Sequence, residues 1–429
     1  MKSAAGAAAG TVAALSPFSV WAAPGPGSKF ELKLRQDLIY DGMFDMALRS
    51  FNSKNKKVSV KSSYVDSDIL GWGHERDTAL EVPSWYTEGE KCEIFLGRGP
   101  ALAQLADAGI IAPLDELIDS SERLSRDDYH RSVYGSVLDS ATYRGKLWGI
   151  PLIGDTYSLF CNTDLFKAAG VEKPPVTWKE TIEKAGRLTR DTDGDGEPDV
   201  FGYSQCSFQF PLQIITSGID FVDMENKRCL FDTDEGLDAL ETYRSTKQYS
   251  PPHVNFEYGD MGMKVSVLTN AFGKYKDINH IITRLPEGRR RANTYGDSDG
   301  IVAFALAAGL DEDTKYAAWK VIEYLTSERM YFKIVEMARM LPLRNSIREG
   351  EKYTAYRKKF PQVESFLEEM EWAVPKPCIP EYRFIEVVMR EILLPVQREG
   401  GDKLTSTQLR EHLKEQAERV NEKLRKSVW

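Results

Sequence analysis

Short runs of alternating apolar and polar residues are separated by stretches in which apolar residues recur every three or four positions. Residues 30–34 (FELKL) and 58–61 (VSVK) have the period of two that is typical of a strand with one buried face. Between them, Phe44, Leu48 and Phe51 fall at helical spacing. Strands that alternate with helices in this way predict an α/β fold with a largely parallel sheet.

The alternation continues along the chain. Residues 92–96 (CEIFL) form an apolar run that leads into a helical pattern, and residues 157–162 (YSLFCN) alternate as a half-buried strand does. Residues 177–180 (TWKE) are a capping box that opens a helix, and residues 301–310 carry no charge and predict a buried strand. The box at 405–408 (TSTQ) opens a last helix with one apolar stripe, so this helix should pack against the rest.

Composition excludes several classes of protein. The chain has 429 residues, enough for two or three domains, and its 42% apolar content is that of a globular protein. With 56 basic and 65 acidic residues the net charge is −9, and no basic block is present. Nucleic-acid binding is therefore not expected, because phosphate contacts need clustered Lys and Arg. The short cluster Arg289-Arg290-Arg291 reads as a solvated turn.

The N-terminus resembles an export signal. Residues 4–23 carry no charge, Lys2 precedes them, and small residues allow cleavage after Ala22. The stretch is mostly Ala and Gly, which argues against a membrane span. We therefore expect a signal-like leader at 1–22 and a flexible leader at 23–29; the alternative is a disordered tail.

Cysteine and histidine spacings give no catalytic or zinc signature. The five cysteines contain no Cys-x-x-Cys pair, and the five histidines show no zinc-hydrolase spacing. Cys206 and Cys229 could form a disulfide if the fold brings them together; the alternative is buried free thiols. The chain also lacks a nucleophile elbow, a phosphate loop and a dinucleotide fingerprint. No catalytic residue is predicted.

An Asp-rich loop is the sharpest local motif. Carboxylates at alternate positions with a central Gly are the oxygen-rich arrangement that Ca²⁺ prefers, although Gly202 occupies the place of the chelating Glu. Two interpretations stay open, a structural Ca²⁺ site and an Asp/Gly-rich turn. No cofactor is otherwise required. The candidate metal ligands are Asp191, Asp193, Asp195, Glu197 and Asp199.

Aromatic residues are frequent in loop-like places. Trp72 and Trp85 lie among Gly, Pro and Ser, and Tyr295 precedes an acidic Gly-containing segment. Flat aromatic faces stack on the apolar faces of sugar rings, while nearby polar side chains bind the hydroxyls. The alternative is that most of these aromatics belong to the core. Those flanked by Gly or acidic residues are the better candidates for a cleft.

Several segments together resemble the family 1 extracellular solute-binding proteins of ABC importers, the group that includes maltodextrin-binding protein. Their order and spacing match over nearly all of residues 30–429. The resembling segments are 105–114 (LADAGIIAPL), 145–151 (GKLWGIP), 159–166 (LFCNTDLF), 175–180 (PVTWKE), the Asp-rich loop, 262–267 (GMKVSV), 318–320 (AWK), 325–328 (LTSE) and 341–346 (LPLRNS).

The resemblance implies an α/β two-lobe periplasmic-binding-protein fold, type II-like, with a hinge that the chain crosses more than once. Lobe one would comprise 30–153 and 284–327, and lobe two 157–282 and 330–429. A ligand would bind in the cleft, and closure of the lobes would trap it. Carried over by position, the candidate ligand-binding residues are Trp72, Trp85, Tyr157, Phe208, Phe210, Phe272, Tyr295, Asp297 and Tyr382.

The function implied is that of a monomeric periplasmic or otherwise extracytoplasmic receptor, without enzymatic activity. It would deliver a small solute, a carbohydrate or oligosaccharide, to an ABC permease. Relatives in the family also carry polyol phosphates, so the solute stays open. Two alternatives come from other classes of protein, a secreted polysaccharide-acting enzyme and a surface scaffold.

Overall fold

A computed structural model of the chain describes residues 29–37, 44–65, 91–121, 129, 131–133, 135–251, 256–295 and 301–428. The predicted leader at 1–22 lies outside this part, as do residues 23–28. Within it, no helix combines the length and apolar character needed to cross a membrane.

The first of two large sheets has seven strands in the order β14-β7-β13-β3-β1-β2, with β4 beside β13. β1 and β2 pair in parallel, and β1 buries Leu32 and Leu34 on one face, as the period of two predicts. The strands are β1 (Phe30–Asp37), β2 (Val58–Val65), β3 (Ile94–Arg98), β4 (Ile111–Ala112), β7 (Ile150–Gly154), β13 (Val302–Ala307) and β14 (Leu341–Pro342). The helices of this first lobe are α1 (Asp45–Lys54), α3 (Gly99–Asp107), α4 (Asp115–Asp119), α6 (Gly135–Asp139), α12 (Glu312–Leu325), α13 (Glu328–Ala338), α14 (Asn345–Arg348) and α15 (Glu351–Lys359).

The second sheet has four strands in the order β11-β8-β10-β9. These are β8 (Tyr157–Asn162), β9 (Phe201–Ser204), β10 (Met261–Val267) and β11 (His280–Thr283). The helices of this second lobe are α7 (Thr163–Ala168), α8 (Trp178–Leu188), α9 (Phe210–Thr216), α10 (Asp234–Lys247), α11 (Leu268–Phe272), α16 (Val363–Met370), α17 (Tyr382–Gln397) and α18 (Ser406–Arg425), with short 3₁₀ turns η2 (Ser207–Gln209) and η3 (Phe256–Tyr258).

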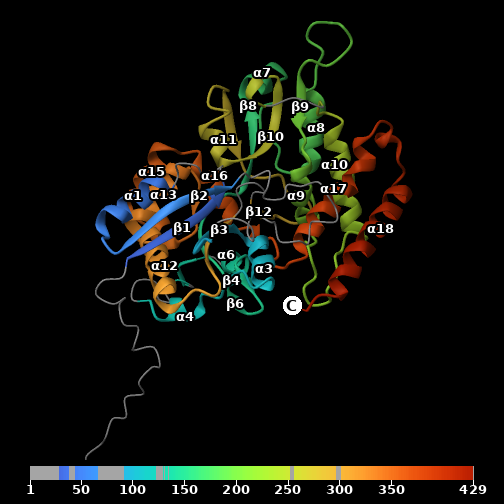
Figure 1. Cartoon of the computed structure of the whole chain (residues 1–429). Coiled ribbons are helices and arrows are strands. Elements are labelled where there is room, and N and C mark those ends of the chain that lie inside the picture. The colour runs from blue at the N-terminus through green and yellow to red at the C-terminus, as the bar shows by residue number, and fades with distance from the viewer. Residues whose placement is uncertain are drawn as a thin grey trace, which may run out of the picture.

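The helix starts follow from their capping residues. The Thr177 hydroxyl accepts a hydrogen bond from the backbone N–H of Glu180 at 3.1 Å and opens α8. Thr405 and Gln408 form the complete capping box that opens α18. The stripe of α18 packs against α10 and α17 on the outer side of the second lobe (Figure 1). Val428 lies beyond this helix and is exposed.

Two buried clusters form the core. One lies between the second sheet and α8, α9, α10, α17 and α18. The other fills the first lobe and continues onto the opposite face of the second sheet, where Phe160 packs against Tyr275 and Phe366. Since both faces of β8 are covered, all its side chains are buried, and the prediction of a half-buried strand is wrong.

The two sheets confirm the predicted two-lobe α/β architecture, but the prediction of a largely parallel sheet is wrong. β13 pairs antiparallel with β3, β4 and β7, and β8 pairs antiparallel with β10 and β11, because these strands come from chain segments that return from the other lobe.

Two of the predicted segment assignments differ from the pairing and packing. The prediction places residues 284–292 in lobe one, but Glu287 bridges Thr177 and the N–H of Arg290 donates to the carbonyl of Thr216 in the second lobe. The prediction also places residues 330–429 in lobe two, but β14 pairs with β7 of the first sheet, and α13 and α14 contact β14. The chain returns to the second lobe near α16, which contacts β8.

All five cysteines are free thiols, and the alternative of a bridge between Cys206 and Cys229 is not realised. Cys229 is buried, and its thiol donates to the carbonyl of Ala417 at 3.6 Å. Packing rather than a disulfide therefore holds this part of the second lobe.

Candidate functional site

The carboxyl ends of β1, β3 and β7 in the first sheet and of β9 and β10 in the second lie on the sides of the sheets that a link of two residues connects. β13 runs antiparallel to both β3 and β7, so β7 points in the same direction as β3, and β1 is parallel to β3. In the second sheet, β8 runs antiparallel to β10, so its amino end lies at the carboxyl ends of β9 and β10. β7 ends at Gly154 and β8 begins at Tyr157. Ligands of α/β proteins bind outside the carboxyl ends of the strands, and we therefore place the candidate site here.

The link itself, Asp155 and Thr156, is fully buried. The Asp155 carboxylate accepts hydrogen bonds from the backbone N–H of Thr156 at 3.0 Å and of Leu268 at 2.9 Å. Leu268 is the first residue of α11, so the carboxylate also caps the turn that follows β10. The Thr156 hydroxyl donates to the carbonyl of Phe366 in α16 at 2.9 Å. The link is therefore attached to two elements of the second lobe.

Two predicted site residues come together at this link. Tyr157 is its exit into β8, and Tyr295 pairs with Thr156 through an isolated antiparallel bridge. The Tyr295 hydroxyl lies 3.1 Å from the Ser136 hydroxyl of α6, in the first lobe. Both tyrosines are 2% exposed. They lie where the chain passes between the lobes.

Three further predicted aromatics follow strand ends but pack into the core clusters. Phe210 packs edge-to-face on Tyr243 with ring centroids 6.0 Å apart, and Tyr382 does so on Phe221 at 5.7 Å. Phe272, at the end of α11, is half-buried and packs on Phe360 at 5.1 Å. All three rings therefore have apolar partners within the protein, and a ligand-binding role for them stays a prediction.

The other candidates are not placed. Trp72, Trp85 and Asp297 lie outside the described residues, and the side chain of Phe208 in η2 is also outside them. Their assignment to the site stays a prediction.

Sequence reasoning missed the side chain that holds the turn after β9. Gln209 is fully buried, and its amide nitrogen donates to the carbonyls of Ser204 and Val265, each at 3.2 Å. Its amide oxygen accepts from the Tyr203 hydroxyl at 3.2 Å. One glutamine thus joins the carboxyl ends of β9 and β10 beside the candidate site. Only its position between two predicted aromatics, Phe208 and Phe210, could have singled it out.

Sequence reasoning also missed the polar groups that join the chain crossings. β12 (Asn293–Thr294) and β15 (Ala373–Val374) pair in parallel next to the link. Asn293 is fully buried and Glu369 is 1% exposed. Burial raises the pKa of the Glu369 carboxyl above its usual range, opposed by the hydrogen bond from Asn293 and the charge of Arg291. No motif marks these residues, because their partners are distant in sequence.

The Asp-rich loop lies at the other end of the second sheet. It joins α8 to the amino end of β9, away from the carboxyl ends, and the bridge between Arg190 and Val200 closes it. The position of the Asp-rich loop in the fold therefore does not support a role in solute binding at the link. A structural role agrees with it.

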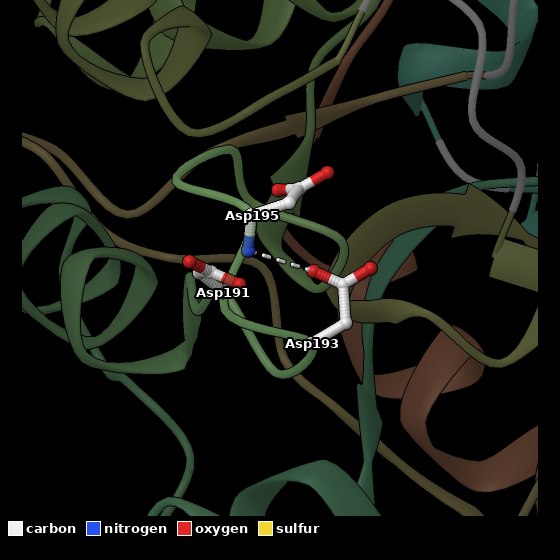
Figure 2. A group of neighbouring side chains, drawn as sticks. All are labelled: Asp191, Asp193 and Asp195. Carbon is white, nitrogen blue, oxygen red and sulfur yellow. Dashed lines mark hydrogen bonds between the residues drawn. The ribbon is translucent and has the colours of Figure 1, made fainter.

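Three carboxylates of this loop lie near one another (Figure 2). Ligand atoms of Asp191, Asp193 and Asp195 all lie within 4.8 Å of one another, on exposed side chains. The two oxygens of Asp191 accept from the backbone N–H groups of Gly194 at 2.6 Å and Gly196 at 2.9 Å, and these bonds lower the pKa of the carboxyl. This donor set of hard oxygens fits Ca²⁺.

The other two predicted ligands are placed differently. The Asp199 carboxylate accepts from the hydroxyl of Thr192 at 2.7 Å, and it does not join the converging group. Glu197 is exposed and contributes its backbone N–H to Asp195 at 2.9 Å.

Comparison with known proteins places the chain. A family profile described as bacterial extracellular solute-binding protein matches residues 86–331. A putative binding protein of Brucella abortus is 22% identical over 321 residues, which are 70% of this chain and 72% of that protein. The sn-glycerol-3-phosphate-binding periplasmic protein UgpB of Brucella melitensis is 24% identical over 298 residues, 61% of this chain and 66% of that protein.

Solved structures share the fold. An ABC substrate-binding protein of Listeria monocytogenes, in complex with cycloalternan, matches with a TM-score of 0.75 and 17% identity over 92% of this chain and 99% of its own. UgpB of Mycobacterium tuberculosis, in complex with glycerophosphocholine, matches with a TM-score of 0.72 and 16% identity over 93% of this chain and 99% of its own. These likenesses extend over both lobes.

Proposed function

Because the chain belongs to the bacterial extracellular solute-binding proteins, we propose that it is an exported receptor that binds a carbohydrate between its lobes and delivers it to an ABC permease. The receptor acts outside the cytoplasm as a monomer. The observation that carries this proposal is the arrangement of the carboxyl ends of both sheets across the link Asp155–Thr156. A solute held there contacts both lobes, so its binding favours the closed arrangement.

Support for a carbohydrate comes from the structural relatives and from the candidate aromatics. Cycloalternan and maltotriose are the compounds named with two of the matching structures. The aromatic candidates are of the residue type whose flat faces stack on sugar rings. Tyr157 and Tyr295 are 2% exposed in this arrangement of the lobes, so their rings would have to become accessible to contact a sugar.

A second solute class is a polyol phosphate. The relatives that suggest it are the two UgpB proteins, named for sn-glycerol-3-phosphate and in complex with glycerophosphocholine. A phosphate needs cationic or N–H partners, whereas a neutral sugar needs aromatic faces and hydroxyl partners. The two classes therefore make different demands on the same site.

We also propose that the solute leaves chemically unaltered. The family and the matching structures are binding proteins, and the sequence offers no nucleophile or metal-hydrolase motif. A secreted polysaccharide-acting enzyme stays the alternative that the experiment must address.

A panel experiment tests both points. The protein is titrated calorimetrically with maltotriose, a cyclic α-glucan, sn-glycerol-3-phosphate and glycerophosphocholine, and the recovered compound is analysed by mass spectrometry. A carbohydrate receptor binds a sugar and returns it intact, and saturation at 100 times Kd stabilises the fold by about 2.7 kcal/mol. Selective binding of the phosphates would favour the second class, and cleaved sugar would overturn the receptor proposal.

For the Asp-rich loop we propose a structural Ca²⁺ site formed by Asp191, Asp193 and Asp195. Ca²⁺ titration of the wild type should release or absorb heat and raise the melting temperature. Asp193→Asn removes one charge from the loop and should weaken the effect, whereas Asp313→Asn in α12, also an exposed acid, should not. Absence of heat with the wild type at millimolar Ca²⁺ would reject the site.

A further inference from the structure

The three places where the chain passes between the lobes are joined by side-chain hydrogen bonds. The first is the link 155–157, the second contains β12 and Tyr295, and the third contains α16 and β15. We use the name joint for residues 155–157, 293–295 and 369–374. Backbone pairing holds two of its strands together, since β12 and β15 are parallel partners and the N–H of Asn293 donates to the carbonyl of Trp372 at 3.0 Å.

Asn293 connects the first crossing to the second. Its amide oxygen accepts from the backbone N–H of Tyr157 at 3.2 Å, and its amide nitrogen donates to the carbonyl of Tyr157 at 2.8 Å. A backbone strand would pair with Tyr157 in the same way, so the side chain completes the edge where β8 begins. The same nitrogen donates to the Glu369 carboxylate at 2.6 Å. Both donors and the acceptor of this buried amide are therefore used inside the joint.

Glu369 connects the third crossing to the second. One of its oxygens accepts from Asn293, and the other accepts from the backbone N–H of Leu285 at 3.3 Å. Arg291 lies 3.7 Å from the carboxylate and stacks on Trp372 with its guanidinium 4.6 Å from the ring centroid. A buried carboxylate is tolerated here because hydrogen bonds and a nearby cation compensate its desolvation.

We propose that Asn293 and Glu369 are positioning residues that set the relative orientation of the two lobes in the solute-free protein, without contacting the solute. They join all three crossings into one rigid unit, so the lobes cannot rotate independently about each crossing.

This unit contacts both lobes. In the first lobe, α16 contacts β14 and the Tyr295 hydroxyl lies 3.1 Å from the Ser136 hydroxyl, and the contacts with the second lobe are more numerous. Thr156 donates to the carbonyl of Phe366 in α16, and the Ser365 hydroxyl donates to the carbonyl of Ile282 in β11 at 3.3 Å. α16 also packs on Phe160 of the second sheet. Any effect of these residues on solute affinity rests on the proposed function. Their effect on the orientation of the lobes can be measured without a solute and does not rest on it.

Asn293→Asp is the sharpest test. The substitution keeps the oxygen that accepts from Tyr157 but removes the two N–H donors, and it places a second acceptor against the Glu369 carboxylate and the Tyr157 carbonyl. Asn421→Asp is the matched control, because the Asn421 amide oxygen accepts from the backbone N–H of Cys229 at 2.8 Å within the second lobe. Glu369→Gln is the second variant if Asn293→Asp does not fold.

The measurement is the distance distribution between spin labels at Lys56→Cys in the first lobe and Lys179→Cys in the second, both exposed, in a Cys206→Ser background and without any solute. We expect Asn293→Asp and Glu369→Gln to broaden the distribution and move its mean, and Asn421→Asp to leave it unchanged. A lowered melting temperature with an unchanged distance distribution would mean that Asn293 and Glu369 only stabilise the fold, and it would overturn the proposal. Because no solute is present, this result is independent of the panel experiment.

Discussion

Replacing Gln209 by Leu probes the turn that shapes the second-lobe side of the candidate site. Leucine has nearly the volume of glutamine but cannot form hydrogen bonds. The fully buried Gln209 makes three, from its amide nitrogen to the carbonyls of Ser204 and Val265 and from the Tyr203 hydroxyl to its amide oxygen. The substitution thus removes these bonds without creating a large cavity.

The expected cost follows from the bonds lost. A buried hydrogen bond contributes about 0.5–1.5 kcal/mol net, and a partner left unsatisfied costs about 1–3 kcal/mol. Each carbonyl oxygen has a second lone pair that can still accept a hydrogen bond. The total loss is therefore smaller than three times the cost of one unsatisfied partner. We expect Gln209→Leu to lower the free energy of unfolding by about 2–4 kcal/mol and to weaken solute binding, because η2 loses its anchor.

Urea denaturation followed by circular dichroism measures the change in stability, and calorimetry with a bound compound from the panel measures affinity. Gln248→Leu is the control, because Gln248 is exposed and donates only to the carbonyl of Ser245 in its own helix at 2.8 Å. It should change stability by less than about 0.5 kcal/mol. A similarly small loss for Gln209→Leu would refute the anchoring role.

Three other predictions follow from buried groups. Burial raises the pKa of the Cys92, Cys229 and Cys378 thiols to about 12 and that of the Cys161 thiol further. A thiol reagent at pH 8 should therefore modify only the half-buried Cys206 in the folded protein, and all five cysteines in denaturant. Fast reaction of a second thiol in the folded state would contradict this. Because folding raises the pKa of Glu369, the folded state binds the Glu369 proton more tightly than the unfolded state does. The free energy of unfolding of the wild type, relative to that of Glu369→Gln, should therefore fall as the pH rises from the ordinary carboxyl pKa through the raised pKa. Urea titrations that give the same difference at every pH would disprove this prediction. The buried Tyr331 hydroxyl donates to the carbonyl of Leu152 and accepts from the N–H of Leu343 at 2.8 Å. Tyr331→Phe should therefore lower the free energy of unfolding, measured by urea denaturation, by about 1–3 kcal/mol. Tyr258→Phe, at a 69% exposed position, should cause no measurable change.

Periodicity and capping in the sequence predicted the main elements of the fold. The alternation at β1, the uncharged run at β13, the Thr177 N-cap of α8 and the capping box of α18 are local features, and local physics decides them. The two lobes and the first crossing between β7 and β8 were implied by the resemblance to a known family and not by local pattern. Only the strands and helix starts depend on residues close together in the chain.

The remaining features depend on contacts between distant residues. Whether β8 is covered on one face or two depends on α16, about 200 positions later, as the bond between Thr156 and Phe366 at a separation of 210 residues illustrates. The return of the chain to the first sheet through β14 is likewise invisible to periodicity, because this strand has only two residues. Asn293 and Glu369 lie in no recognisable motif, and only their partners mark them as important.

Solution scattering with and without a saturating concentration of the compound that binds in the panel is the most direct measurement. The account predicts that the radius of gyration decreases on binding and that the compound is recovered unchanged. A radius of gyration that stays constant at saturation would contradict trapping between two lobes, and a compound returned with a broken bond would contradict a receptor.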